Sequence, residues 1–226
     1  MKIELLRETD STNNYIKRYL SGGENVIVCA ERQTGGKGTK GRSFSSNDGG
    51  VYFSALNFYE NFPASNAFQI MTHSAVAVCR TAEAFSVTPQ IKWANDIYVG
   101  NKKLCGILIE NECRNGYVKH SIVGIGINVN NDLSSLGGIA VGLSEAAGRK
   151  LSVAEVRDKL IENWNTPDDF SDYLSYVRFL GRDVLVTEGE RKFLATALRI
   201  LEGGRLEISE QGKIRALSSA EISLKF

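Results

Sequence analysis

The chain has 226 residues, of which 42% are hydrophobic, enough to bury the core of one full domain with a small appendage. Lys and Arg (27) nearly cancel Asp and Glu (26), and this balance excludes a general nucleic-acid coat and a polybasic membrane surface. The sequence has no apolar run near the roughly 18 residues of a membrane span, no signal-peptide pattern and only scattered cysteines. These features predict a soluble, cytoplasmic protein without a zinc site.

The first part of the chain predicts a helix, two strands and a second helix. Cap-forming residues at 10–13 precede apolar residues at helical spacing, and this helix ends at residues 21–23. A buried strand at 26–30 runs into a glycine-rich loop over 35–50, after which 51–56 resumes β character. Residues 66–86 are mostly apolar and lack internal Gly and Pro, as expected of a buried helix.

The remaining part predicts strands, then helices, then strands again. Strands are expected at 90–93, 97–99, 104–110 and 117–129, with the last two joined by an Asn115-Gly116 turn. A capping box at 152–155 opens a helix that runs to about Trp164, and residues 166–169 cap another with Pro167 at its first position. Short strands follow at 184–187, 194–201, 206–208, 213–217 and 221–224. The expected fold is α+β, with a domain over 1–179 and a small β-barrel domain over 180–226.

The glycine-rich loop is the first candidate site. Residues 31–42 carry four basic residues and four glycines, which suits a phosphate cradle, although a solvated surface loop fits the composition too. Residues 36–41 match GxGxxG, but turn-forming residues follow where a dinucleotide site needs a helix. A Walker A loop also fails, because Gly38 stands where Ser or Thr is required. The loop lies between strands, where it could fold over a nucleotide as a lid.

Two further segments concentrate polar groups and glycines beside strands. Residues 92–96 and 102–108 supply lysines, an Asn-Asp pair and a glycine, which suits anion and Mg²⁺ or ribose binding as well as an ordinary hairpin. Gly124 and Gly126 lie in one strand and indicate close approach by a ligand or a neighbouring chain, or a bulge. His73 and His120 lack partners at ligand spacing and are expected to be structural. No nucleophile elbow is present, which favours a mechanism without a protein nucleophile.

Taken together, these motifs resemble the biotin protein ligase family over nearly the whole chain. The resemblance is carried, in the family's order, by residues 10–13, 33–42, 92–96, 103–108 and 124–128. It implies a mixed-sheet catalytic domain of the class II synthetase-like type, flanked by helices, followed by a small SH3-like β-barrel. It also implies that biotin is activated with ATP and Mg²⁺ as biotinyl-5′-AMP and transferred to a lysine of a biotin carboxyl carrier domain.

The resemblance assigns roles to individual residues. The implied catalytic cations are Lys103, between the biotin carboxylate and the α-phosphate, and Lys37. The implied biotin-binding residues are Ser11, Thr12, Asn13, Gln33, Gly36, Lys103 and Gly106. The implied nucleotide-binding residues are Lys37, Thr39, Lys40, Arg42, Trp93, Asn95 and Asn128, with packing alone as the alternative for Trp93. Asp96 is placed at the Mg²⁺.

The chain departs from the family pattern in three places. Lys37-Gly38-Thr39 replaces the usual Arg-Gly-Arg, which predicts looser retention of the adenylate because Thr39 carries no charge. Ala94 replaces proline in the third motif. The sequence also begins near the first motif, and for this reason we expect no DNA binding. The alternatives left open are a lipoate or octanoate ligase and a silent biotin-binding regulator. Monomer and homodimer both remain open.

Overall fold

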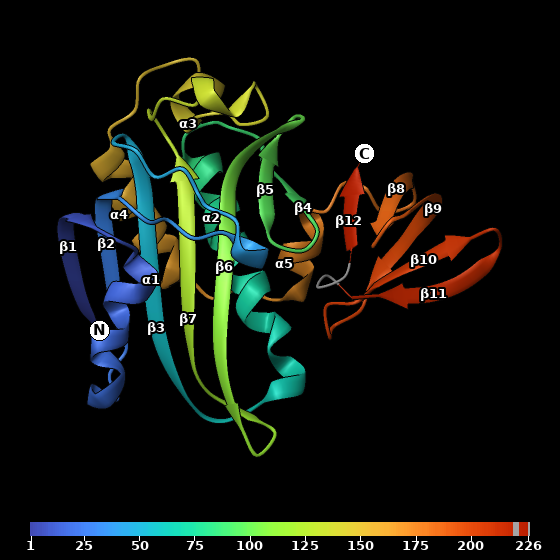
Figure 1. The fold of residues 1–226 in the computed structure, drawn as a ribbon, viewed down its shortest axis with the longest axis horizontal. Helices are drawn as coiled ribbons and strands as arrows, with labels where there is room; N and C mark the ends of the chain where they lie inside the picture. The colour runs from blue at the N-terminus through green and yellow to red at the C-terminus, as the bar shows by residue number, and fades with distance from the viewer. Residues whose placement is uncertain (219–221, 226) are drawn as a thin grey trace.

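The computed structural model describes residues 1–218 and 222–225, but not the side chains of Lys40 and of residues 222–225. A large mixed sheet backed by helices forms the first part, and a smaller antiparallel sheet lies to its right in Figure 1. The α+β class expected from the sequence is therefore confirmed. Among the described residues, no helix combines the length and apolarity needed to cross a membrane.

The large sheet has seven strands in the order β1-β2-β3-β7-β6-β5-β4. The parallel pair at one edge consists of β1 (Lys2–Thr9) and β2 (Val26–Gln33), while every other pair is antiparallel. The other strands are β3 (Gly50–Pro63), β4 (Gln90–Lys92), β5 (Asp96–Val99), β6 (Lys102–Arg114) and β7 (Tyr117–Asn128). The Asn115-Gly116 turn between β6 and β7 has positive φ at both residues, as predicted.

Helices bury the rear face of this sheet in Figure 1. The main covering elements are α2 (Phe68–Ala84) and α4 (Val153–Trp164), and α5 (Phe170–Ser175) packs beside α2. A single large core results, in which the Trp164 ring of α4 lies 5.3 Å from that of Phe53 in β3. Short α3 (Leu143–Ala146) and the 3-10 helices Ala64–Asn66 and Ser134–Leu136 lie in the connections.

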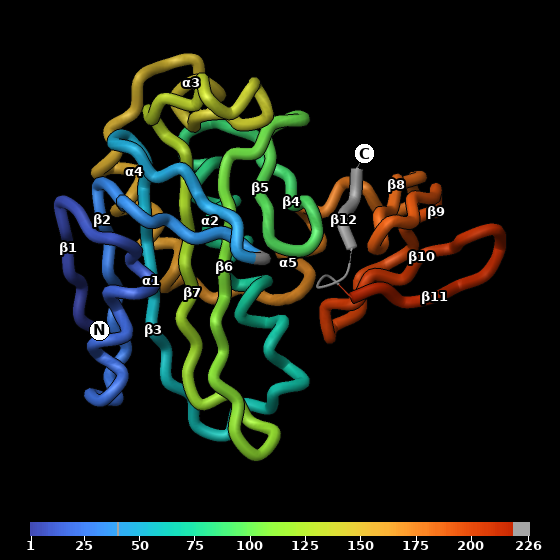
Figure 2. Tube along the Cα trace, in the orientation of Figure 1, coloured from blue at the N-terminus to red at the C-terminus, as the bar shows by residue number. Residues whose placement is uncertain are grey.

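The front face is covered at the β1 side and crossed by a loop. One turn of helix, α1 (Thr12–Tyr15), and the 3-10 helix Ile16–Gly22 bury a small second core with β2 and β3. The glycine-rich loop between β2 and β3, with the 3-10 turn Thr39–Gly41, runs in front of β3 and β7 towards β6 (Figure 2). The sheet face between this loop and α1 is where the candidate site lies.

Helix starts were predicted with mixed success. The Ser152 hydroxyl accepts the Glu155 amide, so the capping box of α4 is confirmed. The prediction that Pro167 begins the next helix is wrong, because α5 starts at Phe170. Asp169 is its N-cap, since its carboxylate accepts the amides of Ser171 and Asp172.

The C-terminal sheet has five antiparallel strands in the order β11-β10-β9-β8-β12. They are β8 (Asp183–Glu188), β9 (Arg191–Ile200), β10 (Leu206–Glu210), β11 (Lys213–Leu217) and β12 (Ile222–Lys225), which fits the predicted small β domain. Glu221, included in the last predicted strand, lies outside the described residues. The domain boundary at 179/180 stays a prediction. The two parts meet where the Trp93 indole N–H donates to the Gly204 carbonyl at 3.0 Å.

Candidate functional site

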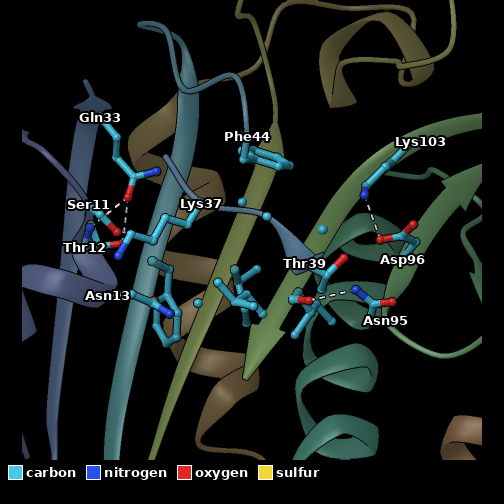
Figure 3. A pocket seen from close by; sticks show the side chains of 18 residues that line it. Ser11, Thr12, Asn13, Gln33, Lys37, Thr39, Phe44, Asn95, Asp96 and Lys103 are labelled. Atoms are coloured by element: carbon cyan, nitrogen blue, oxygen red, sulfur yellow. Dashed lines mark hydrogen bonds and ion pairs between the residues drawn. The ribbon is translucent and has the colours of Figure 1, made fainter. Parts of the chain in front are cut away.

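A narrow pocket of about 50 Å³ lies on the front face of the large sheet, beneath the glycine-rich loop. Its walls come from α1, the end of β2, the loop, and strands β3, β5, β6 and β7. In Figure 3 a polar group of side chains lies at the left end and the Lys103–Asp96 pair lies at the right. Segments far apart in the sequence thus converge on one elongated slot.

The left end is built from buried polar side chains. Ser11, Thr12 and Asn13 are each at most 4% exposed, and one residue separates them from the end of strand β1. The Gln33 side-chain oxygen accepts both the Thr12 amide, at 2.8 Å, and the Thr12 hydroxyl, at 3.0 Å. The Gln33 amide nitrogen in turn donates to Ser46. These bonds give the polar end a defined arrangement of donors and acceptors.

Glycines form the floor of the slot. Gly106 of β6 pairs directly with Gly126 of β7, and the ring of Phe44 lies over both. A Cβ added at Gly126 would come within 2.5 Å of that ring, and one at Gly124 within 2.4 Å of the Asn13 side-chain oxygen. The close approach predicted for Gly124 and Gly126 is therefore present, and it is made by side chains of the same chain.

The right end holds a cation and its counterion. The Lys103 ammonium lies 2.7 Å from a carboxylate oxygen of Asp96, and both side chains are partly exposed. Asn95 donates its side-chain amide to the Ile107 carbonyl, which turns the Asn-Asp pair toward β6. The Lys103 backbone is held by Ile139 and Val141 on its far side. A fixed cation at a pocket end suits an anionic group of a ligand.

The glycine-rich loop is folded back as an irregular hairpin. Lys37 and Ser43 form an isolated antiparallel β-bridge, and the Gly38 amide donates to the Arg42 carbonyl at 2.7 Å. The Lys37 ammonium donates to the side-chain oxygen of Asn14 at 2.7 Å, so the loop is tied to α1 across the left end of the slot. Lys37 and Thr39 both line the pocket, where the sequence predicted phosphate and nucleotide contacts.

Not every predicted site residue lies in the pocket. Trp93 is 6% exposed and bonds to Gly204 of the small domain. Asn128 is buried behind the cation end, where its amide nitrogen faces the Lys103 carbonyl at 3.5 Å. Gly36 and Arg42 are outside the pocket walls, and the Lys40 side chain lies outside the described part.

Several residues of the site had been missed in the sequence. Phe44 covers the glycine floor of the slot, and Asn14 accepts the Lys37 ammonium. Ser54 and Glu110 form hydrogen bonds with Asn13 from behind the slot. For Phe44 the signal available was an aromatic residue inside a polar, glycine-rich loop. Ser54 and Glu110 look like ordinary strand residues and carry no such signal.

Neither a thiolate nor a preformed metal cage is found among the described residues of the site. Burial raises the pKa of the Cys105 thiol, which adjoins Gly106, so this thiol stays protonated at neutral pH. No group of three or more His, Cys, Asp or Glu side chains in the described ranges is arranged to hold a metal ion. An Mg²⁺ bound to Asp96 would need phosphate oxygens of a ligand among its other ligands, which is a common arrangement for Mg²⁺.

The histidines have structural contacts. The His73 ring bonds to Asp168 and to the Trp164 carbonyl, so it ties α2 to the segment after α4. His120 packs against Phe58 across the β3–β7 pair. Both lie away from the walls of the slot.

Comparison with known proteins identifies relatives of this architecture. Residues 5–128 match the biotin/lipoate A/B protein ligase family. The chain is 32% identical over 218 residues to the bifunctional ligase/repressor BirA of Bacillus subtilis, covering 89% of this chain and 66% of that protein. It is 25% identical to the biotin–[acetyl-CoA-carboxylase] ligase of Mycobacterium tuberculosis, over 98% of this chain and 88% of that one. The chain thus spans about two thirds of the length of the BirA relative.

Solved structures agree with the sequence matches. The biotin protein ligase of Aquifex aeolicus in complex with biotin and ATP superposes with a TM-score of 0.78. The two chains are 27% identical, and the match covers 99% of this chain and 98% of the Aquifex chain. The similarity therefore includes both sheets.

Proposed function

Since the chain belongs to the biotin/lipoate A/B protein ligase family, we propose that it activates biotin with ATP and transfers it to a lysine of a biotin carboxyl carrier domain. The observation that carries this proposal is the slot itself, with hydrogen-bonding groups at one end and a lysine at the other. Biotin has the same polarity, a cyclic urea at one end of a short apolar chain and a carboxylate at the other. The relatives whose names mention biotin support the same substrate.

The first step joins two anions, so it depends on charge neutralisation and alignment. A biotin carboxylate oxygen attacks the α-phosphorus of ATP, the bond to the bridging oxygen breaks, and pyrophosphate leaves with the electron pair. Lys103 is the cation we assign between the carboxylate and the α-phosphate. Lys37, on the hairpin, is assigned to the phosphates, and its ammonium must leave Asn14 at the polar end of the slot to reach them. ATP would bring Mg²⁺, which neutralises the phosphate oxygens.

The second step needs only an aligned amine. The lysine nitrogen of the carrier attacks the acyl carbon of biotinyl-5′-AMP, the carbon–oxygen bond to phosphate breaks, and AMP leaves while the amine loses a proton. No covalent protein intermediate is required, which agrees with the protonated Cys105 thiol. We place the reaction in the cytoplasm, where the four free thiols of the chain would stay reduced.

The test is ATP–pyrophosphate exchange with biotin, lipoate or octanoate. We expect exchange with biotin alone, and its loss in Lys103→Ala. Lys102→Ala is the matched control, because Lys102 is the adjacent lysine but pairs with Glu145 at 3.2 Å outside the slot. Loss of exchange in both variants would contradict the assigned role of Lys103.

The other ligands decide between family branches. Exchange with lipoate or octanoate instead of biotin would place the chain among lipoate or octanoate ligases. Biotin binding without any exchange would leave a non-catalytic regulator. Transfer is tested separately by mass spectrometry of an isolated carrier domain, which should gain one biotin on one lysine.

A further inference from the structure

One buried hydroxyl outside the slot links two residues that line it. Ser46 belongs to the second half of the glycine-rich loop, is 4% exposed and is not part of the pocket wall. Its hydroxyl accepts the Gln33 side-chain amide at 2.8 Å and donates to the Phe44 carbonyl at 3.0 Å. Gln33 lines the polar end of the slot, and the Phe44 ring lies over the glycine floor (Figure 3). Ser46 therefore connects the polar end with the cover of the floor.

The orientation of the Gln33 side chain follows from these bonds. The Ser46 hydroxyl has a single proton, which goes to Phe44, so toward Gln33 it can only accept. At the other end of the same amide, the Gln33 oxygen accepts both the backbone amide and the hydroxyl of Thr12. Ser46 and Thr12 thus hold the Gln33 amide at both ends and fix what it presents to the slot.

The loop backbone supports the same link, and Gly36 leaves the space for it. The Gln33 N–H donates to the Ser46 carbonyl at 3.0 Å, and the Phe44 N–H donates to the Gly36 carbonyl at 2.9 Å. A Cβ added at Gly36 would lie 2.3 Å from the Ser46 hydroxyl oxygen and 2.4 Å from the Phe44 carbonyl oxygen. Gly36 lies outside the pocket walls, so its contribution to the slot is the room it gives to the Ser46–Phe44 bond.

From these contacts we infer that Ser46 is a positioning residue for biotin: it sets Gln33 and Phe44 relative to one another, in space that Gly36 leaves free. The inference rests on the proposed function and deepens it. Without the Ser46 hydroxyl, the Gln33 amide loses its acceptor and the Phe44 carbonyl loses its donor, so both residues must be ordered again when biotin binds. Lys103 lies at the other end of the slot and takes no part in the link.

The test measures biotin and ATP separately in variants of the full-length chain. Biotin dissociation constants come from calorimetry without ATP, and the KM for ATP and kcat come from ATP–pyrophosphate exchange at saturating biotin. Ser46→Ala should weaken biotin binding by about tenfold, the usual effect of leaving a buried polar group unpaired. Its KM for ATP and its kcat should stay within about twofold of wild type, because the Lys103 end is intact.

Gly36→Ala reaches the same link from the other side. The added methyl group pushes on the Ser46 hydroxyl and the Phe44 carbonyl, so this variant should also weaken biotin binding by about tenfold. Because both substitutions break one link, the double variant should bind biotin about as weakly as the weaker single variant. Two independent losses would instead multiply to about a hundredfold.

Controls separate this effect from loss of structure. Ser45→Ala removes the neighbouring hydroxyl, which lies outside the link, and should bind biotin as wild type does. Melting temperatures identify unfolded variants, and Gly36→Ala decides the matter if Ser46→Ala does not fold. Unchanged biotin affinity in the folded variants, equal weakening of biotin and ATP, or independent losses in the double variant would overturn the inference. Failure of wild type to bind biotin would instead overturn the proposed function on which the inference rests.

Discussion

The contact between Phe44 and Gly126 predicts a measurable coupling between the glycine-rich loop and the sheet. A Cβ at residue 126 would lie 2.5, 2.8 and 3.1 Å from three carbons of the Phe44 ring, so the ring must move by roughly 1 Å to reach ordinary contact. Overpacking of this kind costs about 1–3 kcal/mol of unfolding free energy. Phe44→Ala alone should cost about 1 kcal/mol, because the ring is only partly buried.

The double variant tests whether the two effects share one cause. Without the ring, the alanine at 126 has space, so Gly126→Ala with Phe44→Ala should cost only about 1 kcal/mol, less than the sum of the single variants by about 1–3 kcal/mol. Urea unfolding of the four proteins measures this difference, with Gly22→Ala as a control that meets no neighbouring atom. Additive costs would refute the view that Phe44 sits on the Gly126 backbone.

Four further predictions concern the loop, the domain contact and the thiols. Thr39→Arg should slow escape of biotinyl-5′-AMP by about tenfold, since it adds a charge-assisted bond to phosphate; an unchanged off-rate would contradict this. Trp93→Phe should lower the unfolding free energy by about 1–3 kcal/mol in urea, because the Gly204 carbonyl loses its donor; no loss would contradict the domain contact. With a thiol reagent, native protein should react at one cysteine, the exposed Cys113. Burial raises the pKa of Cys29 to about 12, above the value of about 9 for a free thiol. The unfolded chain therefore ionises first, and this contribution to stability should fall as pH rises from about 9 to 12.

Much of the site was predictable because its residues belong to compact motifs. Gln33, Lys103 and Gly106 lie in segments whose composition already indicated anion or ligand binding, whereas the role of Thr12 came from the family resemblance; all four line the slot. Glycines in strand β7 indicated close approach by a ligand or a neighbouring chain, or a bulge, and the close contacts in the structure are made by the Phe44 ring and the Asn13 amide of the same chain. Patterns of this kind are local, so one sequence is enough to reveal them.

The missed residues depend on contacts across the sheet. Ser54 pairs with Gly124 of β7, and Glu110 with Ile122, and these registers bring both side chains to Asn13. Ser54 and Asn13 are 41 residues apart, a separation no local pattern reveals. Strand β1 was also missed, because its alternation of charged and apolar residues covers only residues 2–5 and breaks at Leu6.

Asp96 and Lys103 illustrate the same limit within the predicted motifs. The family resemblance implies a metal ion for one and the substrate for the other, with no reason to connect them. The β5–β6 register sets Asp96 opposite Gly106, and the Lys103 ammonium reaches its carboxylate at 2.7 Å. Both side chains are 25–32% exposed, so the pair contributes only about 0–1 kcal/mol and a phosphate can compete for the lysine. We therefore propose that Asp96 holds the Lys103 ammonium at the end of the slot until an anionic ligand competes for it, and that its oxygens then become available to a cation that accompanies a phosphate.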